Sequence, residues 1–191
     1  MQEPPEDLPP DFDQAAILVV DDDRITRQVT VHMLKILSAN IRISEAENGR
    51  VALESLDEIV PDIIILDLLM PEMDGRTLLR HLRSNDTTRM TPVAVLTAFG
   101  DENRKRDLTL LGCEAFLHKP VKSMELIAVM HALMRTRRLY QKLAAEAKEA
   151  QAKYSGLVRL LHSLIGEKAT NHLVRKNAIA LATRGKPDSS P

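Results

Sequence analysis

Residues 63–75 read IIILDLLMPEMDG. The stretch opens with a continuous apolar run of the kind found in parallel strands that are covered on both faces. The run ends at a carboxylate, Asp67, and Asp74-Gly75 then marks the junction with the next element. A buried strand that ends in an acid and leads into a helix predicts a parallel α/β sheet.

The same alternation of apolar strand and amphipathic helix recurs between residues 15 and 134. We expect strands at 17–20, 41–46, 62–66, 93–96 and 115–118, and helices at 24–38, 50–58, 76–84 and 101–111. Because each crossover between parallel strands is right-handed, the pattern predicts one doubly wound sheet of five parallel strands, with helices on both faces.

The helix expected at 24–38 contains a regular apolar row. Leu34 and Ile36 lie near its edges, and its members recur every fourth residue: Ile25, Val29, Met33 and Leu37. This spacing predicts that the row is the face of the helix that packs on the sheet.

Polar residues follow the expected strands where each strand ends. They are Asp21 and Asp22 after the first strand, Asp67 after the third, Thr97 after the fourth and Lys119 after the fifth. The carboxyl ends of parallel strands meet at one edge of a sheet, which is where such folds bind their ligands. We therefore expect these side chains to form one site.

The motifs at these ends resemble those of the receiver domains of two-component systems, the CheY-like family. In the order and with the gaps of that family, they are Val19-Val20-Asp21-Asp22, Leu66-Asp67 with Met70-Pro71 and Asp74-Gly75, Leu96-Thr97-Ala98, and Lys119-Pro120. The resemblance covers about residues 15–134 and implies a flavodoxin-like strand order of 2-1-3-4-5.

The chemistry of the cluster favours phosphoryl transfer. Carboxylates that lie close together repel one another unless a cation lies among them, and Mg²⁺ prefers a few carboxylates with waters and phosphate oxygens. We expect Asp21 and Asp22 to bind Mg²⁺, and Asp67 to be both a ligand and the nucleophile that accepts the phosphoryl group. Lys119 would neutralise charge on the phosphoryl oxygens, and Thr97 would donate its hydroxyl to one of them.

The resemblance implies further features of the site. The backbone carbonyl of Leu69 would complete the metal site, and the Lys119–Pro120 bond would be cis. After phosphorylation Thr97 would be drawn across its loop, and Phe116 would rotate into the space that it leaves. A phenylalanine cannot donate a hydrogen bond there, so its inward state would depend on packing alone. The fourth and fifth helices, together with the C-terminal helix, would carry the signal onward.

Charge divides the chain into two parts. Residues 1–134 hold 14 Lys and Arg against 23 Asp and Glu, whereas the remaining 57 residues hold 12 against 4. Residues 1–14 are acidic and rich in proline, and we expect a disordered leader there. The single cysteine, Cys113, excludes an internal disulfide, and we find neither a secretory signal nor an apolar run long enough to span a membrane. The composition predicts a cytoplasmic protein.

From Ser123 a helix is expected to continue past the receiver, with residues 135–154 as a helical linker. Two rows recur at sevens: Leu126, Leu133, Tyr140, Ala147, Tyr154 and Leu161, and Val129, Thr136, Leu143, Ala150, Leu157 and Leu164. These rows favour a parallel two-stranded coiled coil that joins two copies of the chain. The alternative is a single helix that folds back on its own acidic domain.

Residues 155–191 are expected to form a short helical tail, with two helices around Gly166 and a loose end. The basic excess invites a DNA-binding interpretation. A helix-turn-helix centred on Gly166 would place His162, His172 and Arg175 at positions that need small or apolar residues. DNA binding is therefore disfavoured, and no output enzyme is recognisable.

Three classes of function were weighed. The first is a response regulator that receives a phosphoryl group from a histidine kinase or phosphotransfer protein and acts on a downstream protein. The second is a phosphatase of the haloacid dehalogenase type, which needs a carboxylate two residues after the nucleophile, where this chain has Leu69. The third is a pseudo-receiver that acts as a dimerisation or interaction module without phosphorylation. The sequence favours the first.

Overall fold

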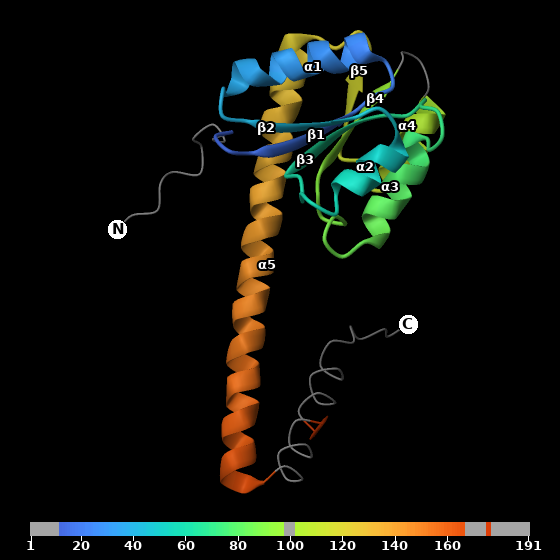
Figure 1. Ribbon diagram of the computed structural model, residues 1–191. Coiled ribbons are helices and arrows are strands. Elements are labelled where there is room, and N and C mark those ends of the chain that lie inside the picture. The colour runs from blue at the N-terminus through green and yellow to red at the C-terminus, as the bar shows by residue number, and fades with distance from the viewer. Residues whose placement is uncertain (1–11, 98–101, 167–174, 177–191) are drawn as a thin grey trace, which may run out of the picture. The chain divides into compact units, whose positions relative to one another are not determined.

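Strands and helices alternate along the chain in a computed structural model that describes residues 12–97, 102–166 and 175–176 (Figure 1). The elements in order are β1 Ala16–Val20, α1 Arg24–Leu37, β2 Arg42–Ala46, α2 Gly49–Ser55, β3 Ile63–Asp67, α3 Gly75–Ser84, β4 Val93–Thr97, α4 Glu102–Leu110, β5 Ala115–His118 and α5 Ser123–Ile165. The predicted strands and helices are all present. Their described ends differ from the predicted ones by at most three residues, the largest difference being the earlier end of α2 at Ser55.

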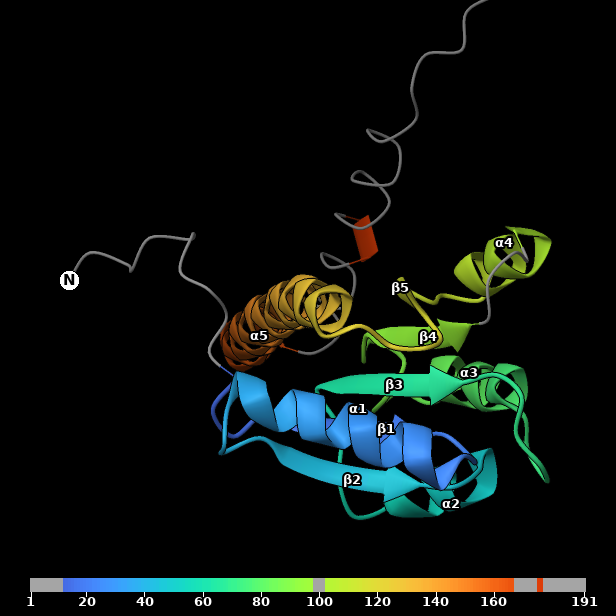
Figure 2. The ribbon, with the colours of Figure 1, turned by 90° about the horizontal axis from the view of Figure 1, so that it is seen from above.

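The five strands form one parallel sheet in the order β2-β1-β3-β4-β5, which confirms the predicted fold class (Figure 2). The strand pairs are in register, so that Val20 lies beside Leu66 and Leu66 beside Val95. All three central strands are buried along their whole length, as the continuous apolar runs predict.

Alternate residues of each strand point to opposite faces of the sheet, and each face has its own core. One core joins α1 and α5 to the sheet; its members include Ile17, Val19, Leu34, Ile63, Ile65, Leu126, Met130 and Leu133. The other core joins α2, α3 and α4 to the opposite face; its members include Leu18, Val20, Ala52, Ile64, Leu66, Leu78, Leu82 and Leu108. Packing on both faces fixes where every strand ends, and thereby positions the site.

The buried face of α1 differs from the predicted one. The side chains of Ile25, Val29 and Ile36 are exposed, and the fully buried residues are Thr30 and Leu34. Because the helix turns about 100° per residue, a row with a spacing of four rotates by about 120° around the axis over twelve residues. The predicted row therefore begins on the solvent side of α1 and reaches the core only near its end, at Met33 and Leu37.

The packed structure begins at Phe12, inside the segment for which the sequence predicts disorder; residues 1–11 lie outside the described residues. The Phe12 side chain is only 4% exposed, and its ring meets that of His131 on α5 edge to face at a centroid distance of 5.1 Å. The segment that precedes β1 therefore packs against α5, the last helix of the domain.

The first turns of α5 belong to the domain that holds the sheet. Leu126, Met130 and Leu133 are buried in its core, so the first positions of the heptad rows are not available to a coiled coil. Farther along, the Asp62 carboxylate accepts hydrogen bonds from Arg137 Nε at 3.2 Å and Gln141 Nε2 at 3.3 Å. Gln141 is also the last residue of the first of two compact units.

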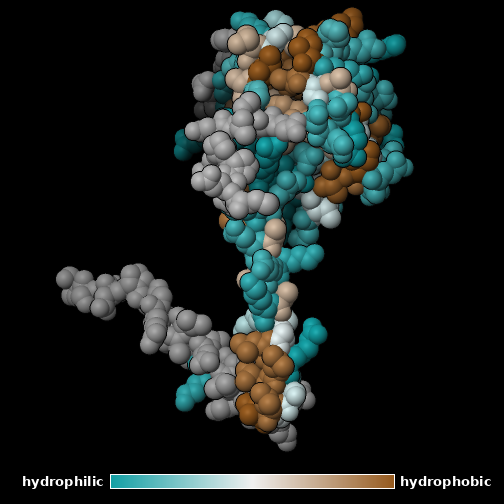
Figure 3. All heavy atoms as spheres, turned by 90° about the vertical axis from the view of Figure 1, so that its left-hand side faces the viewer, coloured by the Kyte–Doolittle hydropathy of each residue, from teal (hydrophilic) through white to brown (hydrophobic). Residues whose placement is uncertain are grey.

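The second unit, Lys142–Pro191, contains the distal part of α5, which continues without a break to Ile165. Gly166 follows with a φ of 84°, a conformation that suits glycine and ends the helix. Several large apolar side chains of this segment are exposed: Leu143, Tyr154, Leu157, Leu160, Leu164 and Ile165. Figure 3 shows apolar side chains gathered near the end of the helix.

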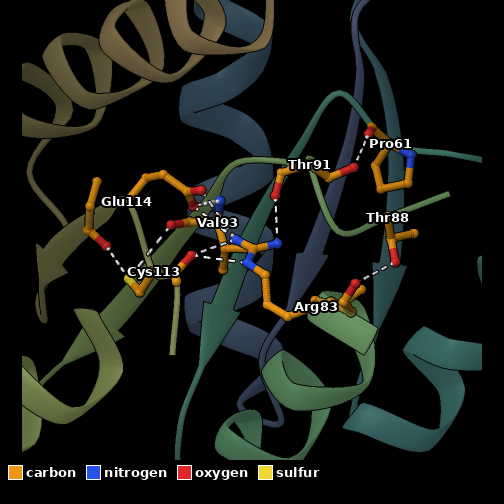
Figure 4. A network of polar contacts seen from close by, with 10 residues as sticks. Pro61, Arg83, Thr88, Thr91, Val93, Cys113 and Glu114 are labelled. Carbon is orange, nitrogen blue, oxygen red and sulfur yellow. Dashed lines mark hydrogen bonds and ion pairs between the residues drawn. The ribbon is translucent and has the colours of Figure 1, made fainter. Parts of the chain in front are cut away.

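A polar network centred on Arg83 lies at the edge of the sheet opposite the carboxyl ends of the strands (Figure 4). The guanidinium donates to the carbonyl oxygens of Gly112, at 2.6 Å, and Thr91, at 2.9 Å, and pairs with the Glu114 carboxylate at 2.9 Å. Glu114 also accepts a hydrogen bond from the backbone N–H of Val93. Arg83 therefore ties the end of α3 to the segments that lead into β4 and β5.

Cys113 lies in the same region and is buried. Burial raises the pKa of its thiol to about 11, so the thiol stays protonated at neutral pH. Its side chain packs in the core that the sheet shares with α2, α3 and α4. Among the described residues, no helix is both long enough and apolar enough to cross a membrane.

Replacing Arg83 by methionine should lower the free energy of unfolding by about 2 kcal/mol, because the change leaves the half-buried Glu114 carboxylate and two carbonyl groups without their donor. The matched control is Arg89→Met, which breaks an exposed ion pair with Asp86 and should change stability little. Urea unfolding followed by circular dichroism measures both variants. Equal stabilities of the two variants would contradict the assigned role of the network.

Candidate functional site

The loop after β1 places two carboxylates at the sheet edge and uses a third to begin a helix. Asp23 is the N-cap of α1, where its side chain accepts hydrogen bonds from the backbone N–H groups of Ile25 and Thr26. Asp21 is fully buried, whereas Asp22 is exposed. The cap fixes the end of the loop and leaves Asp21 and Asp22 to face the site.

Asp67, the last residue of β3, lies at the centre of the site and is only 6% exposed. Its Oδ1 accepts a hydrogen bond from the N–H of Leu68 at 2.7 Å. The loop that follows turns back so closely that a Cβ on Gly75 would lie 2.0 Å from the Asp67 carbonyl oxygen. Asp74 caps α3 by accepting from the N–H of Thr77, at the junction that Asp74-Gly75 marks in the sequence.

Lys119 enters the site from the end of β5. Its backbone N–H donates to the carbonyl oxygen of Thr97, and the bond to Pro120 is cis, as the resemblance implied. The ammonium Nζ lies 2.7 Å from Asp67 Oδ2 and 3.0 Å from Asp21 Oδ2. One cation therefore bridges the two buried carboxylates.

The carboxylates of Asp21, Asp22 and Asp67 form a cluster in which oxygen atoms from each lie within 4.8 Å of one another. Within the described part of the chain, Asp21 Oδ2 is buried without a well-aligned hydrogen bond; its contact with Lys119 is an ion pair. Because this oxygen has no hydrogen bond from the described residues besides its ion pair with Lys119, it can also accept a metal cation. Three oxygen ligands beside an open face suit Mg²⁺, which keeps several waters when it binds. The residues present therefore fit this ion.

The electrostatics reflect burial and pairing. Burial raises the pKa of Asp21 above its ordinary value, although the Lys119 ammonium acts in the opposite direction. Burial by itself lowers the pKa of Lys119, but its contacts with Asp67 and Asp21 outweigh burial and raise it. Lys119 is therefore positively charged at neutral pH, and burial disfavours the charged form of Asp21.

The other predicted residues lie around this cluster. Thr97 is the last residue of β4 and is 7% exposed, and Phe116 on β5 is partly buried against the core shared with α3 and α4. The side chain of Leu69 is 70% exposed and, together with Leu68 and Asp74, helps to line a pocket of about 150 Å³. The sheet thus brings Asp21, Asp22, Asp67, Thr97 and Lys119 to one edge, whereas Phe116 lies within β5 beside Val95. Their individual roles remain predictions.

Sequence reasoning missed Arg27 and Glu45. The Arg27 guanidinium donates to the Asp21 carbonyl oxygen at 2.6 Å and pairs with Glu45 on β2 at 3.1 Å. A charged residue in an amphipathic helix usually faces solvent, so nothing in the pattern of α1 distinguishes Arg27 from Arg24. The displaced face of α1 is what turns Arg27 towards the sheet.

Comparison with known proteins agrees with this geometry. The family model for the response regulator receiver domain matches residues 17–131. The chain is 38% identical over 121 residues to the transcriptional regulatory protein PhoP of Escherichia coli, covering 62% of this chain and 52% of PhoP. It is 34% identical over 144 residues to the response regulator PleD of Caulobacter vibrioides, covering 75% of this chain and 31% of PleD.

Solved structures show the same likeness. The chemotaxis response regulator CheY4 of Vibrio cholerae matches with a TM-score of 0.58 and 28% identity, over 63% of this chain and 98% of CheY4. A response regulator structure from Chloroflexus aurantiacus matches with a TM-score of 0.59 and 30% identity, over 63% of this chain and 97% of that one. Against the curated relatives named above, the chain spans about half or less of their length.

Asp21→Asn should raise the free energy of unfolding by about 1 kcal/mol at pH 7 without divalent cations, because it removes a carboxylate whose charged form is disfavoured by burial. A raised pKa means that the folded wild type binds more protons than the unfolded chain above pH 3.8, so wild-type stability increases as the pH falls through that window. The difference in stability between Asp21→Asn and the wild type should therefore become smaller as the pH falls towards 4.

Urea unfolding at several pH values measures this difference. Asp86→Asn serves as the control, because the Asp86 side chain is 94% exposed and its replacement should leave stability unchanged at every pH. A less stable Asp21→Asn variant at pH 7 would show that the contact with Lys119 outweighs the cost of burying the charge.

Proposed function

Because the chain belongs to the response regulator receiver family of two-component systems, we propose that it is a phosphorylation-dependent response regulator in which Asp67 accepts the phosphoryl group. The phosphodonor would be a histidine kinase or a phosphotransfer protein. The observation that carries the proposal is the bridge of Lys119 between Asp67 and Asp21, beside a carboxylate cluster that fits Mg²⁺.

In the proposed reaction, a carboxylate oxygen of Asp67 attacks phosphorus. A new oxygen–phosphorus bond forms while the bond to the donor breaks, and the leaving group departs with its electron pair. Oδ1 is held by the N–H of Leu68, so the nucleophile is oriented before it reacts. The low exposure of Asp67 limits the access of water to it.

Neutralisation of charge would come from two sides of the nucleophile. Asp21, Asp22, Asp67 and the Leu69 carbonyl would hold Mg²⁺, which supplies charge stabilisation to the phosphoryl oxygens. Lys119 already contacts Asp67 Oδ2, and its ammonium would move from the carboxylate to a phosphoryl oxygen. Thr97, on the neighbouring strand, would donate its hydroxyl to another.

Output would follow from the same charge. A phosphoryl group adds about −1.5 to −2 charge and three acceptor oxygens, enough to draw Thr97 towards Asp67. Phe116 would then move inward and alter the surface formed by α4 and α5. The proposed partner is a downstream protein effector rather than DNA, the proposed location is the cytoplasm, and the receiver is a signalling domain rather than an enzyme that turns over a free substrate.

Incubation with acetyl phosphate and Mg²⁺ should add the mass of one phosphoryl group to the full chain, and Asp67→Asn should abolish the adduct. Asp86→Asn is the matched control and should be phosphorylated as the wild type is. Intact-mass spectrometry at neutral pH measures all three proteins. The adduct should also disappear when EDTA removes the metal.

Two results would contradict the proposal. Rapid release of inorganic phosphate without a lasting adduct would favour a phosphatase. An unmodified wild type with every donor tested would favour the alternative function, a pseudo-receiver that acts as a dimerisation or interaction module.

For the rest of the chain we infer a receiver at residues 15–134, a helical linker at 135–154 and a tail at 155–191. We propose that the distal part of α5 joins two copies of the chain. The support is the heptad pattern of apolar residues: Tyr154 and Leu161 repeat at one position, and Leu157 and Leu164 at the other. Tyr154, Leu157 and Leu164 are exposed, and Leu161 is partly exposed. With the first heptads packed inside the receiver, the pairing would begin beyond Gln141.

Replacing both Leu157 and Leu164 by glutamate should convert a dimer into a monomer, because it places charges in the apolar seam. Ser163→Glu, at an exposed position on the same helix, is the control and should leave the dimer intact. Analytical ultracentrifugation of the full chains reports the masses. A monomeric wild type at tens of micromolar would end the dimer proposal.

A further inference from the structure

We infer that Arg27 is a positioning residue for the metal site, acting through the backbone of Asp21. The inference rests on the proposed function, because it concerns the Mg²⁺ site of that function. Arg27 lies on α1 and belongs to none of the receiver motifs in the sequence. Its side chain is 14% exposed, low for an arginine near the beginning of a surface helix.

The contacts of Arg27 lead directly to the loop that carries the carboxylates. Nη1 donates to the Asp21 carbonyl oxygen at 2.6 Å, a short distance that is typical of hydrogen bonds from a charged donor. On its other side, Nε pairs with Glu45 Oε2 at 3.1 Å. Glu45 lies on β2, one residue before Ala46, whose carbonyl oxygen accepts the N–H of Asp21. Arg27 and β2 thus hold the same loop residue from two directions.

These bonds leave Asp21 little freedom. Its N–H is bound by Ala46, its carbonyl oxygen by Arg27, and its Oδ1 by the N–H of Asp23. Asp22 lies between Asp21 and Asp23, and Asp23 is itself fixed as the N-cap of α1. The orientation of the peptide group between Asp21 and Asp22 therefore depends on Arg27, and with it the direction of the Asp22 carboxylate.

Two physical effects of Arg27 on Mg²⁺ binding have opposite signs. As a cation near the carboxylates, it repels a divalent ion, so its removal would tighten binding. As a group that orients the ligands, it strengthens binding, so its removal would weaken it, and loss of such outer partners commonly weakens metal affinity by about 10- to 100-fold. The contact through the carbonyl oxygen, rather than through a carboxylate, favours the orienting role. The direction in which Mg²⁺ affinity changes when Arg27 is replaced therefore decides between repulsion and orientation.

The experiment measures Mg²⁺ affinity by isothermal titration calorimetry on the full chain at fixed ionic strength. Arg27→Met, which keeps the aliphatic stem, should weaken binding by about tenfold. Arg27→Lys retains the charge and one donor group but loses the planar fork, so it should restore part of the affinity. Glu45→Gln is the matched control: it removes the ion pair, leaves the bond to the Asp21 carbonyl in place, and should weaken binding less than Arg27→Met.

Affinity for Mg²⁺ equal to or tighter than that of the wild type in Arg27→Met would overturn the inference, and urea unfolding of the same samples verifies that each variant is folded. If Arg27→Met does not fold, the comparison of Arg27→Lys with Glu45→Gln decides, and equal affinities for Mg²⁺ in those two variants overturn the inference. Failure of the proposed function gives a different result: a folded wild type that binds no Mg²⁺, or one whose affinity is unchanged by Asp67→Asn. If the wild type binds Mg²⁺ and Asp67→Asn alters that affinity, whereas Arg27→Met does not, only the positioning role of Arg27 is rejected.

Discussion

The repulsion among three carboxylates at one edge of the sheet is the constraint on which the site depends. Asp21 and Asp67 are buried, and placing two charged groups in that environment is costly unless opposite charge lies close to them. Lys119 provides that charge from β5 by contacting both. The strand that delivers the ammonium and the strands that deliver the carboxylates must therefore end at the same edge, which a parallel sheet ensures.

The residues of this cluster do not fully compensate its negative charge. Its electrostatic energy is therefore sensitive to a change in the local charge. Asp21 keeps a raised pKa even beside Lys119, so one cation does not fully compensate the site. A divalent ion or a phosphoryl group alters the balance strongly. The rest of the domain resists such changes, because three fully buried strands and two packed cores hold the strand ends in place. A sensitive site on a rigid sheet is an arrangement suited to switching.

The sequence predicted the sheet and the residues of the site because both depend on simple periodicity. Continuous apolar runs identified β3 and β4, and the convergence of parallel strand ends placed Asp67 near Lys119. It could not predict which face of α1 is buried, since a row with a spacing of four drifts around the helix and leaves Ile25 exposed. Arg27 was missed because its side chain contacts a backbone oxygen, that of Asp21. The pattern of residue types in a sequence does not reveal such contacts.

The helix α5 shows the same division between local pattern and tertiary context. The sequence contains the heptad rows, but Leu126 and Leu133 are buried in the core of the receiver. They therefore cannot pack against a second helix in a coiled coil. Only the distal part of the row presents exposed apolar residues. A repeat in the sequence therefore gives the spacing of apolar residues, whereas the fold decides which partner covers each one.

The most direct test of the account is the free energy of unfolding of the wild-type chain as a function of Mg²⁺ concentration. If a divalent ion relieves the repulsion among Asp21, Asp22 and Asp67, stability should rise by about 1.4 kcal/mol for each tenfold increase in Mg²⁺ above the dissociation constant. The same titration on a chain in which Asp22 and Asp67 are both replaced by asparagine should be flat. A wild-type stability that does not respond to Mg²⁺ would contradict the account.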